Sequence, residues 1–124
     1  MRIASLITAI NVFVASGFAI TGLVNPASML PTGVIAGEAS SMFAMYAAAR
    51  AIPLAVIAFV IIYKRSTSAL IVIGTLAGAI QLADTLIGML MQEPMKIFGP
   101  LAIAVLQFYA IFMLAKSNHQ NSGN

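Results

Sequence analysis

Four long apolar segments constrain the fold of this chain more than any other feature of its sequence. A helix needs about 20 consecutive apolar residues to cross the hydrocarbon core of a bilayer. Each segment meets that length, and stretches rich in proline, glycine or charge separate the segments. The predicted spans cover residues 3–23, 42–63, 69–91 and 97–115. The sequence therefore predicts an all-α fold, an integral membrane four-helix bundle.

The composition supports a membrane environment. Charged residues make up 7% of the 124 residues and hydrophobic residues 61%, whereas a soluble domain has about 25% charged residues. A chain with so little charge cannot cover its surface with groups that bind water, so we expect lipid around it. The length allows one domain. We predict a single four-span domain over residues 1–115 and a polar C-terminal tail over residues 116–124.

The charges at the segment ends predict the orientation in the membrane. Four spans place both termini on the same side, and that side carries most of the basic residues. Cytoplasmic segments are the ones enriched in Lys and Arg, so we predict cytoplasmic termini and the inner (plasma) membrane of a bacterium. The basic residues on the predicted cytoplasmic side are Arg2, Lys64, Arg65 and Lys116, and the other side carries Glu38, Glu93 and Lys96.

The first apolar segment also has features of a cleaved signal peptide. Arg2 precedes the apolar run, and the sequence ASGFA at positions 15–19, which is rich in small residues, resembles a cleavage site. The run continues to Leu23, however, which is longer than the usual apolar region of a signal peptide. We therefore favour a first span that is retained.

Several kinds of chemistry are excluded by residue type. The chain has no cysteine, and its single histidine, His119, lies in the polar tail. Thiolate and histidine-rich metal sites therefore have no ligands here, and we expect no metal and no cofactor. The six basic residues against three acidic ones lie at segment ends. This distribution fits anionic lipid rather than nucleic acid.

Two charged residues interrupt the predicted spans. Arg50 lies near the middle of the second segment, and Asp84 lies in the half of the third segment that is further from the termini. A charge inside lipid costs from about 2.5 to more than 10 kcal/mol. Counted from the same face, the two residues differ in depth by roughly 5 Å, and a short turn joins the two segments. The sequence therefore predicts a buried Arg50–Asp84 ion pair.

Other polar residues gather at a similar depth and predict a polar pocket. Each of the four segments carries at least one of these polar residues, and a random distribution does not explain their gathering at one depth. The same residues could instead hold the helices in register without any ligand. Gly74 and Gly78 form a GxxxG step, which favours the close approach of another helix. The predicted ligand-binding residues are Arg50, Asp84, Gln81, Gln107, Asn11 and Tyr46, and we assign no catalytic residue.

Two short motifs resemble the DoxX-like membrane proteins, in particular a branch of unknown function (DUF4267 type). They are YAAARAIP at residues 46–53 and QLADT at residues 81–85, and the resemblance extends over nearly the whole chain. It implies a four-helix membrane protein without an agreed activity, with Arg50 and Asp84 as shared residues. The wider grouping is thought to touch sterol-binding and sterol-isomerising proteins. Those isomerases use a membrane histidine, which this chain lacks, so the resemblance does not imply isomerase chemistry here.

Binding of a lipid-like or amphipathic small molecule is the function that the sequence favours. A structural or accessory subunit of a membrane complex is the alternative. A small proton-coupled transporter is less well supported, because the first segment offers Asn11 in place of a carboxylate. An intramembrane enzyme is also poorly supported, since no nucleophile–base pair or phosphate loop is present. The expected partners are the lipid bilayer, an amphipathic ligand, and a homodimer or a membrane partner protein.

Overall fold

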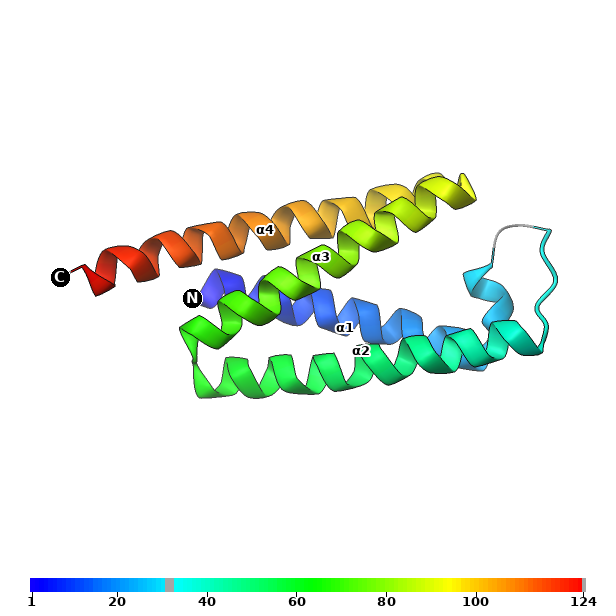
Figure 1. Cartoon of the computed structure of the whole chain (residues 1–124), viewed down its shortest axis with the longest axis horizontal. Helices are drawn as coiled ribbons and strands as arrows, with labels where there is room; N and C mark the ends of the chain where they lie inside the picture. The colour runs from blue at the N-terminus through cyan, green and yellow to red at the C-terminus, as the bar shows by residue number, and fades with distance from the viewer. Residues whose placement is uncertain (31–32, 124) are drawn as a thin grey trace.

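The fold is built from four long helices. The computed structural model describes residues 1–30 and 33–123. Each helix is long and apolar enough to cross a membrane, which confirms the predicted all-α four-helix membrane fold. The chain is therefore a small integral membrane protein. The helices are α1 (Arg2–Val24), α2 (Glu38–Lys64), α3 (Thr67–Met91) and α4 (Pro94–Ser122), and a short 3₁₀ helix, η1 (Pro26–Met29), follows α1 (Figure 1).

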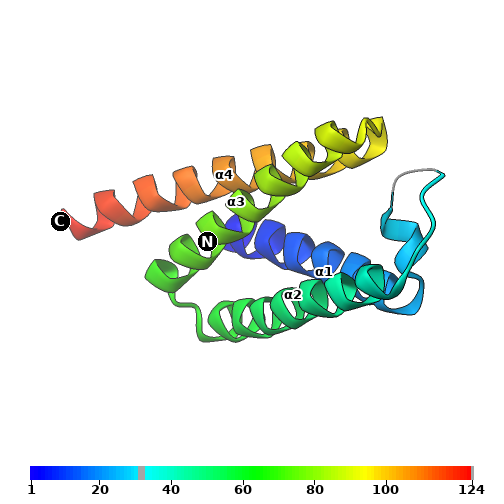
Figure 2. The ribbon, with the colours of Figure 1, turned by 45° about the vertical axis from the view of Figure 1, so that its right-hand side comes forward.

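The four helices pack as two close pairs, α1 with α2 and α3 with α4. α1 also contacts both α3 and α4, so it joins the two pairs. Within the described residues, α2 makes only a limited contact with α3 and none with α4. Figures 1 and 2 show α2 and α3 meeting at their connecting turn and diverging away from it. α2 is consequently the least covered helix, with 17% of its most apolar stretch buried against 28% or more for the others.

Both tight turns of the bundle use the same hydrogen-bonding pattern. α2 is followed by Arg65 and α3 by Gln92, and both residues have left-handed backbones, with φ of 54° and 56°. At the first turn, the Arg65 N–H donates to Ile62 O at 3.1 Å and the Ser66 N–H donates to Ile61 O at 3.4 Å. This Schellman pattern satisfies the last carbonyls of the helix. It reverses the chain in few residues, but it fixes the neighbouring helix only at the turn itself.

Glycines on α3 allow the close packing of this helix against α4. A Cβ atom added at Gly78 would lie 2.9 Å from the Phe108 ring, and one added at Gly88 would meet the backbone carbonyl of Lys96. Gly74 similarly lies against α4 side chains. The predicted close approach at the GxxxG step is therefore confirmed, and the helix that approaches is α4.

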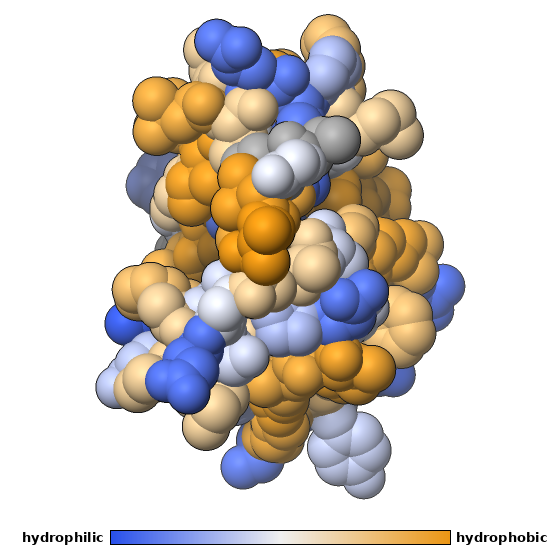
Figure 3. All heavy atoms as spheres, turned by 90° about the vertical axis from the view of Figure 1, so that its right-hand side faces the viewer, coloured by the Kyte–Doolittle hydropathy of each residue, from blue (hydrophilic) through white to orange (hydrophobic). Residues whose placement is uncertain are grey.

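The two ends of the bundle differ in what they carry. Both termini and the turn between α2 and α3 lie at one end, which we call the terminal end (Figure 1). The segment between α1 and α2 and the turn between α3 and α4 lie at the other, which we call the loop end. Figure 3 faces the loop end and shows hydrophilic residues among large hydrophobic ones. Ile35 and Met95 at this end are 92% and 86% exposed, as expected where a protein meets the membrane interface.

The last helix is longer than the predicted span. α4 continues through Ser122, so most of the predicted polar tail is helical. No glycine or proline lies between Lys116 and Ser122 to end the helix. The helix ends beside Gly123, and the terminal end of α4 extends beyond the neighbouring helices (Figure 1).

Candidate functional site

A network of buried polar side chains joins three helices. Gln107 Nε2 on α4 donates to Thr8 Oγ1 on α1 at 2.8 Å. Asn11 Nδ2 donates to Gln107 Oε1 at 3.0 Å, and Gln81 Nε2 on α3 donates to Asn11 Oδ1 at 2.6 Å. All four side chains are at most 4% exposed. Three of the six predicted site residues, Asn11, Gln81 and Gln107, are therefore brought together as expected.

The polar groups of this network satisfy one another. Asn11 and Gln107 each use both their amide nitrogen and their amide oxygen within it. An unsatisfied amide in an apolar interior costs a few kcal/mol, about 1–3 by mutational data, so closing the network fixes the register of α1, α3 and α4. Neither of the two pockets described below is lined by any of its residues. The geometry of these residues is that of a helix-locking cluster, and a role for them in ligand binding stays a prediction.

Arg50 and Asp84 do not form the buried pair that the sequence predicts. Both side chains are exposed, and among the described residues they make no ion pair with each other. The physical reason is the divergence of α2 from α3. α2 packs chiefly on α1, and its buried residues, Ala48, Ala55 and Ala58, lie roughly 160°, 140° and 80° around the helix from Arg50. The face of α2 that carries Arg50 is thus turned away from the helix that α2 contacts.

Tyr46, the sixth predicted residue, is also on the open side of α2. It is 58% exposed and lies one turn from Arg50, so the two side chains share a face. A short turn keeps two helices together only where it joins them, and α2 and α3 do not stay neighbours along their whole length. The glycines of α3 indicate which face of this helix packs closely, and α4 occupies that face.

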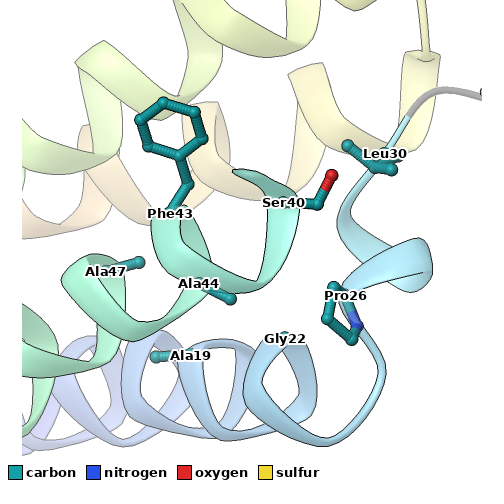
Figure 4. Close-up of a pocket in the computed structure, with 8 residues that line it drawn as sticks. All are labelled: Ala19, Gly22, Pro26, Leu30, Ser40, Phe43, Ala44 and Ala47. Carbon is teal, nitrogen blue, oxygen red and sulfur yellow. The ribbon is translucent and has the colours of Figure 1, made fainter. Parts of the chain in front are cut away.

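An apolar pocket lies at the loop end, where sequence reasoning placed no site (Figure 4). It has a volume of about 230 Å³ and is formed by the last turns of α1, the first turns of α2 and the segment around η1. Small residues on both helices leave this space open, because their side chains are too short to fill it. The pocket is lined by Ala19, Gly22, Pro26, Leu30, Ser40, Phe43, Ala44 and Ala47.

Ser40 is the only one of these eight lining residues with a polar side chain. Figure 4 shows the Phe43 ring directed away from α1, while Ala19 and Ala44 lie between the two helices. A second hollow, lined by Ala9, Ile10, Phe13 and Phe59, is entirely apolar in its residues. It lies on the outer surface of α1 and α2 and has the character of a lipid-facing depression.

One cation lies at the edge of the loop-end pocket. Lys96 Nζ donates to the carbonyl oxygen of Leu30, a lining residue, at 3.4 Å. The same ammonium group is 3.0 Å from Glu93 Oε2. Both side chains are partly exposed, so the ammonium remains accessible to other anions at this end. The pocket thus combines an apolar interior with a charged rim.

The described part of the chain holds no cluster of three or more His, Cys, Asp or Glu residues that could bind a metal ion. Comparison with family models, with curated proteins and with solved structures finds no match. The resemblance to the DoxX-like proteins therefore stays a prediction.

Proposed function

We propose that this integral membrane protein binds the apolar part of a lipid-like or amphipathic molecule in the loop-end pocket. The observation that supports this proposal is the pairing of an apolar lining with a cation at the rim. Seven of the eight lining residues have no polar side-chain group, which favours a hydrocarbon ligand. Lys96 contacts the backbone of the lining residue Leu30, which favours an acidic head group.

The size of the pocket defines what part of the ligand enters it. Pockets that enclose drug-sized ligands are usually about 300–1,000 Å³, and this one is about 230 Å³. It suits one hydrocarbon chain or ring, with the remainder of the molecule in the bilayer or at its surface. Its position at the end of two membrane-spanning helices supports entry from the lipid rather than from water.

The location that we propose follows from the charges at the terminal end. Four basic residues lie there, and the loop end carries both acidic residues that are outside the predicted spans. This asymmetry supports termini in the cytoplasm, and we place the protein in the inner membrane of a bacterium. The binding pocket then opens near the outer face of that membrane.

A space-filling substitution tests the proposed function. Ala44→Phe places a ring in the pocket, whereas Ala49→Phe adds the same ring to an exposed position of the same helix. Each protein is reconstituted in vesicles that contain phosphatidylglycerol with a photoreactive acyl chain, and labelled peptides are mapped by mass spectrometry. We expect labelling of the pocket residues in wild type and in Ala49→Phe, and its loss in Ala44→Phe. Equal labelling of the pocket in both variants would rule the proposal out.

A structural role in an assembly is the second candidate, and a different observation favours it. The two charged residues within the spans, Arg50 and Asp84, are exposed. A single copy in lipid would leave both charges uncovered, which is costly. This observation points to a protein partner on the surface that carries Arg50 and Asp84.

A further inference from the structure

Arg50 is exposed at the middle of a membrane-spanning helix. It lies close to the midpoint of α2, which begins at Glu38 and ends at Lys64. At 1.5 Å per residue it is about 18 Å from the nearer end of the helix, while half of the hydrocarbon core is about 15 Å thick. The guanidinium group is thus placed deep in the membrane on a face that no other helix of the chain covers.

Asp84 lies at a matching depth on α3. The turn that joins α2 to α3 follows Lys64 and precedes Thr67, so it gives a common origin for measuring depth on both helices. Measured along the helices from that turn, Asp84 and Arg50 are at about 26 Å and about 21 Å. Asp84 is also exposed. One cation and one anion therefore stand uncovered at nearly the same level, on two helices that diverge from each other.

We propose that a second copy of this chain covers the open side of α2 and α3, and that Arg50 of each copy pairs with Asp84 of the other. A two-fold axis along the membrane normal preserves the depth of every residue, and it makes the interface self-complementary. Each dimer then contains two ion pairs between copies. The interface has no net charge, which suits its place in the hydrocarbon core.

A second copy neutralises both Arg50 and Asp84, which an anionic lipid or a cation alone does not. An anionic lipid could neutralise Arg50 but would leave Asp84 uncovered, and a cation would do the reverse. A different protein would need one anion and one cation at these two depths, whereas this chain already carries both. Arg50 and Asp84 are the only charged residues inside the predicted spans, and α2 has the free surface that such a contact needs. The proposal is argued from Arg50 and Asp84, neither of which lines the loop-end pocket, so it does not rest on ligand binding.

Complementary charge reversals test the proposal. Arg50→Asp leaves two anions in each copy, and Asp84→Arg leaves two cations. A homodimer of either variant has only like charges at positions 50 and 84, so we expect each variant to be monomeric by native mass spectrometry in mild detergent, with wild type dimeric. When differently tagged copies of the two variants are expressed together, both ion pairs can form between them. We expect a one-to-one heterodimer at the wild-type yield.

Three outcomes of that experiment would overturn the proposal. The first is a monomeric wild type, and the second is a dimer that survives either single reversal. The third is a dimer of the chain that carries both reversals, together with no dimer when the two single variants are expressed together. That result would mean that the ion pair forms within one chain. A monomeric wild type that retains phosphatidylglycerol, and loses it in Arg50→Asp, would assign Arg50 to a lipid.

Disulfide crosslinking provides a test in which both charges are kept. The chain has no cysteine of its own, so Tyr46→Cys in one copy and Ile87→Cys in another report only on contacts between copies. Each position is exposed and lies about one turn from its charged neighbour toward the loop end. We expect an interchain disulfide for this pair. Tyr46→Cys with Leu101→Cys on α4 is the control, and equal crosslinking in both pairs would contradict the proposed face.

Discussion

Asn11 and Gln107 are joined by a hydrogen bond of 3.0 Å between Asn11 Nδ2 and Gln107 Oε1, although 96 residues separate them in the sequence. Both side chains are at most 2% exposed. Gln107 also donates to Thr8, and Asn11 also accepts from Gln81. The first helix and the last are thus tied at a single level in the membrane interior, with α3 attached to the same point.

Replacing Gln107 should destabilise the bundle by breaking this connection. Gln107→Leu removes two hydrogen bonds and leaves the Asn11 amide nitrogen without an acceptor. Hydrogen bonds between membrane helices average about 0.6 kcal/mol, and an unsatisfied buried group adds about 1–3 kcal/mol. We expect a loss of about 2 kcal/mol in unfolding free energy, measured by denaturation in detergent. Gln120→Leu, at an exposed position of α4, is the control, and an equal loss there would refute the role of the network.

Substitution of Gly88 should separate α3 from α4. An added Cβ at this position meets the backbone carbonyl of Lys96, and a backbone atom cannot move aside as a flexible side chain can. We expect Gly88→Ala to lower the melting temperature in detergent and to weaken the contact between the two helices.

Gly17→Ala is the matched control for that experiment, because nothing lies within 4 Å of a Cβ added at Gly17. Alanine is favoured over glycine within helices by about 1 kcal/mol, so this variant should be as stable as wild type or more stable. A lower melting temperature in Gly17→Ala than in Gly88→Ala would show that close packing at Gly88 is not what matters.

The sequence predicted the parts of this structure that depend on local patterns. Span lengths follow from runs of apolar residues, and the four helices contain the predicted spans. The meeting of Asn11, Gln81 and Gln107 was also predictable, because buried amides in lipid have to satisfy one another. These predictions require only that the chain spans a membrane and that the depth of each residue is known. They do not require the order in which the helices pack.

The predictions that failed depend on the order in which the helices pack. The Arg50–Asp84 pair required α2 and α3 to remain together, but α3 packs its glycine face on α4 and α2 packs on α1. The loop-end pocket depends on the path of the chain after α1 and on the small residues Gly22 and Ala44, which look like ordinary helix residues in the sequence. The glycines of α3 mark a face that packs closely but do not identify α4 as its neighbour, and no local pattern reveals the pocket.

The orientation of the bundle can be tested with single cysteines, because the chain has none. Ala36→Cys lies in the segment between α1 and α2, and Asn121→Cys lies near the end of α4; both positions are exposed. In spheroplasts treated with a membrane-impermeant maleimide, we expect labelling of Ala36→Cys alone. Both should be labelled after permeabilisation. Labelling of Asn121→Cys in intact spheroplasts would place the termini outside and reverse the proposed topology.

Lys96 should select the head group of a bound lipid without contributing much to stability. Its ion pair with Glu93 is partly exposed and local, since the partners lie within one turn of the same helix end, and such pairs contribute at most about 1 kcal/mol. Lys96→Gln should therefore fold as wild type does. We expect it to reduce pocket labelling by photoreactive phosphatidylglycerol and to leave labelling by phosphatidylcholine with the same acyl chain unchanged, because only the first lipid has a net negative charge. Lys116→Gln, which removes a cation at the terminal end, should change neither. If Lys96→Gln reduces labelling by both lipids equally, Lys96 shapes the pocket rather than recognising the head group.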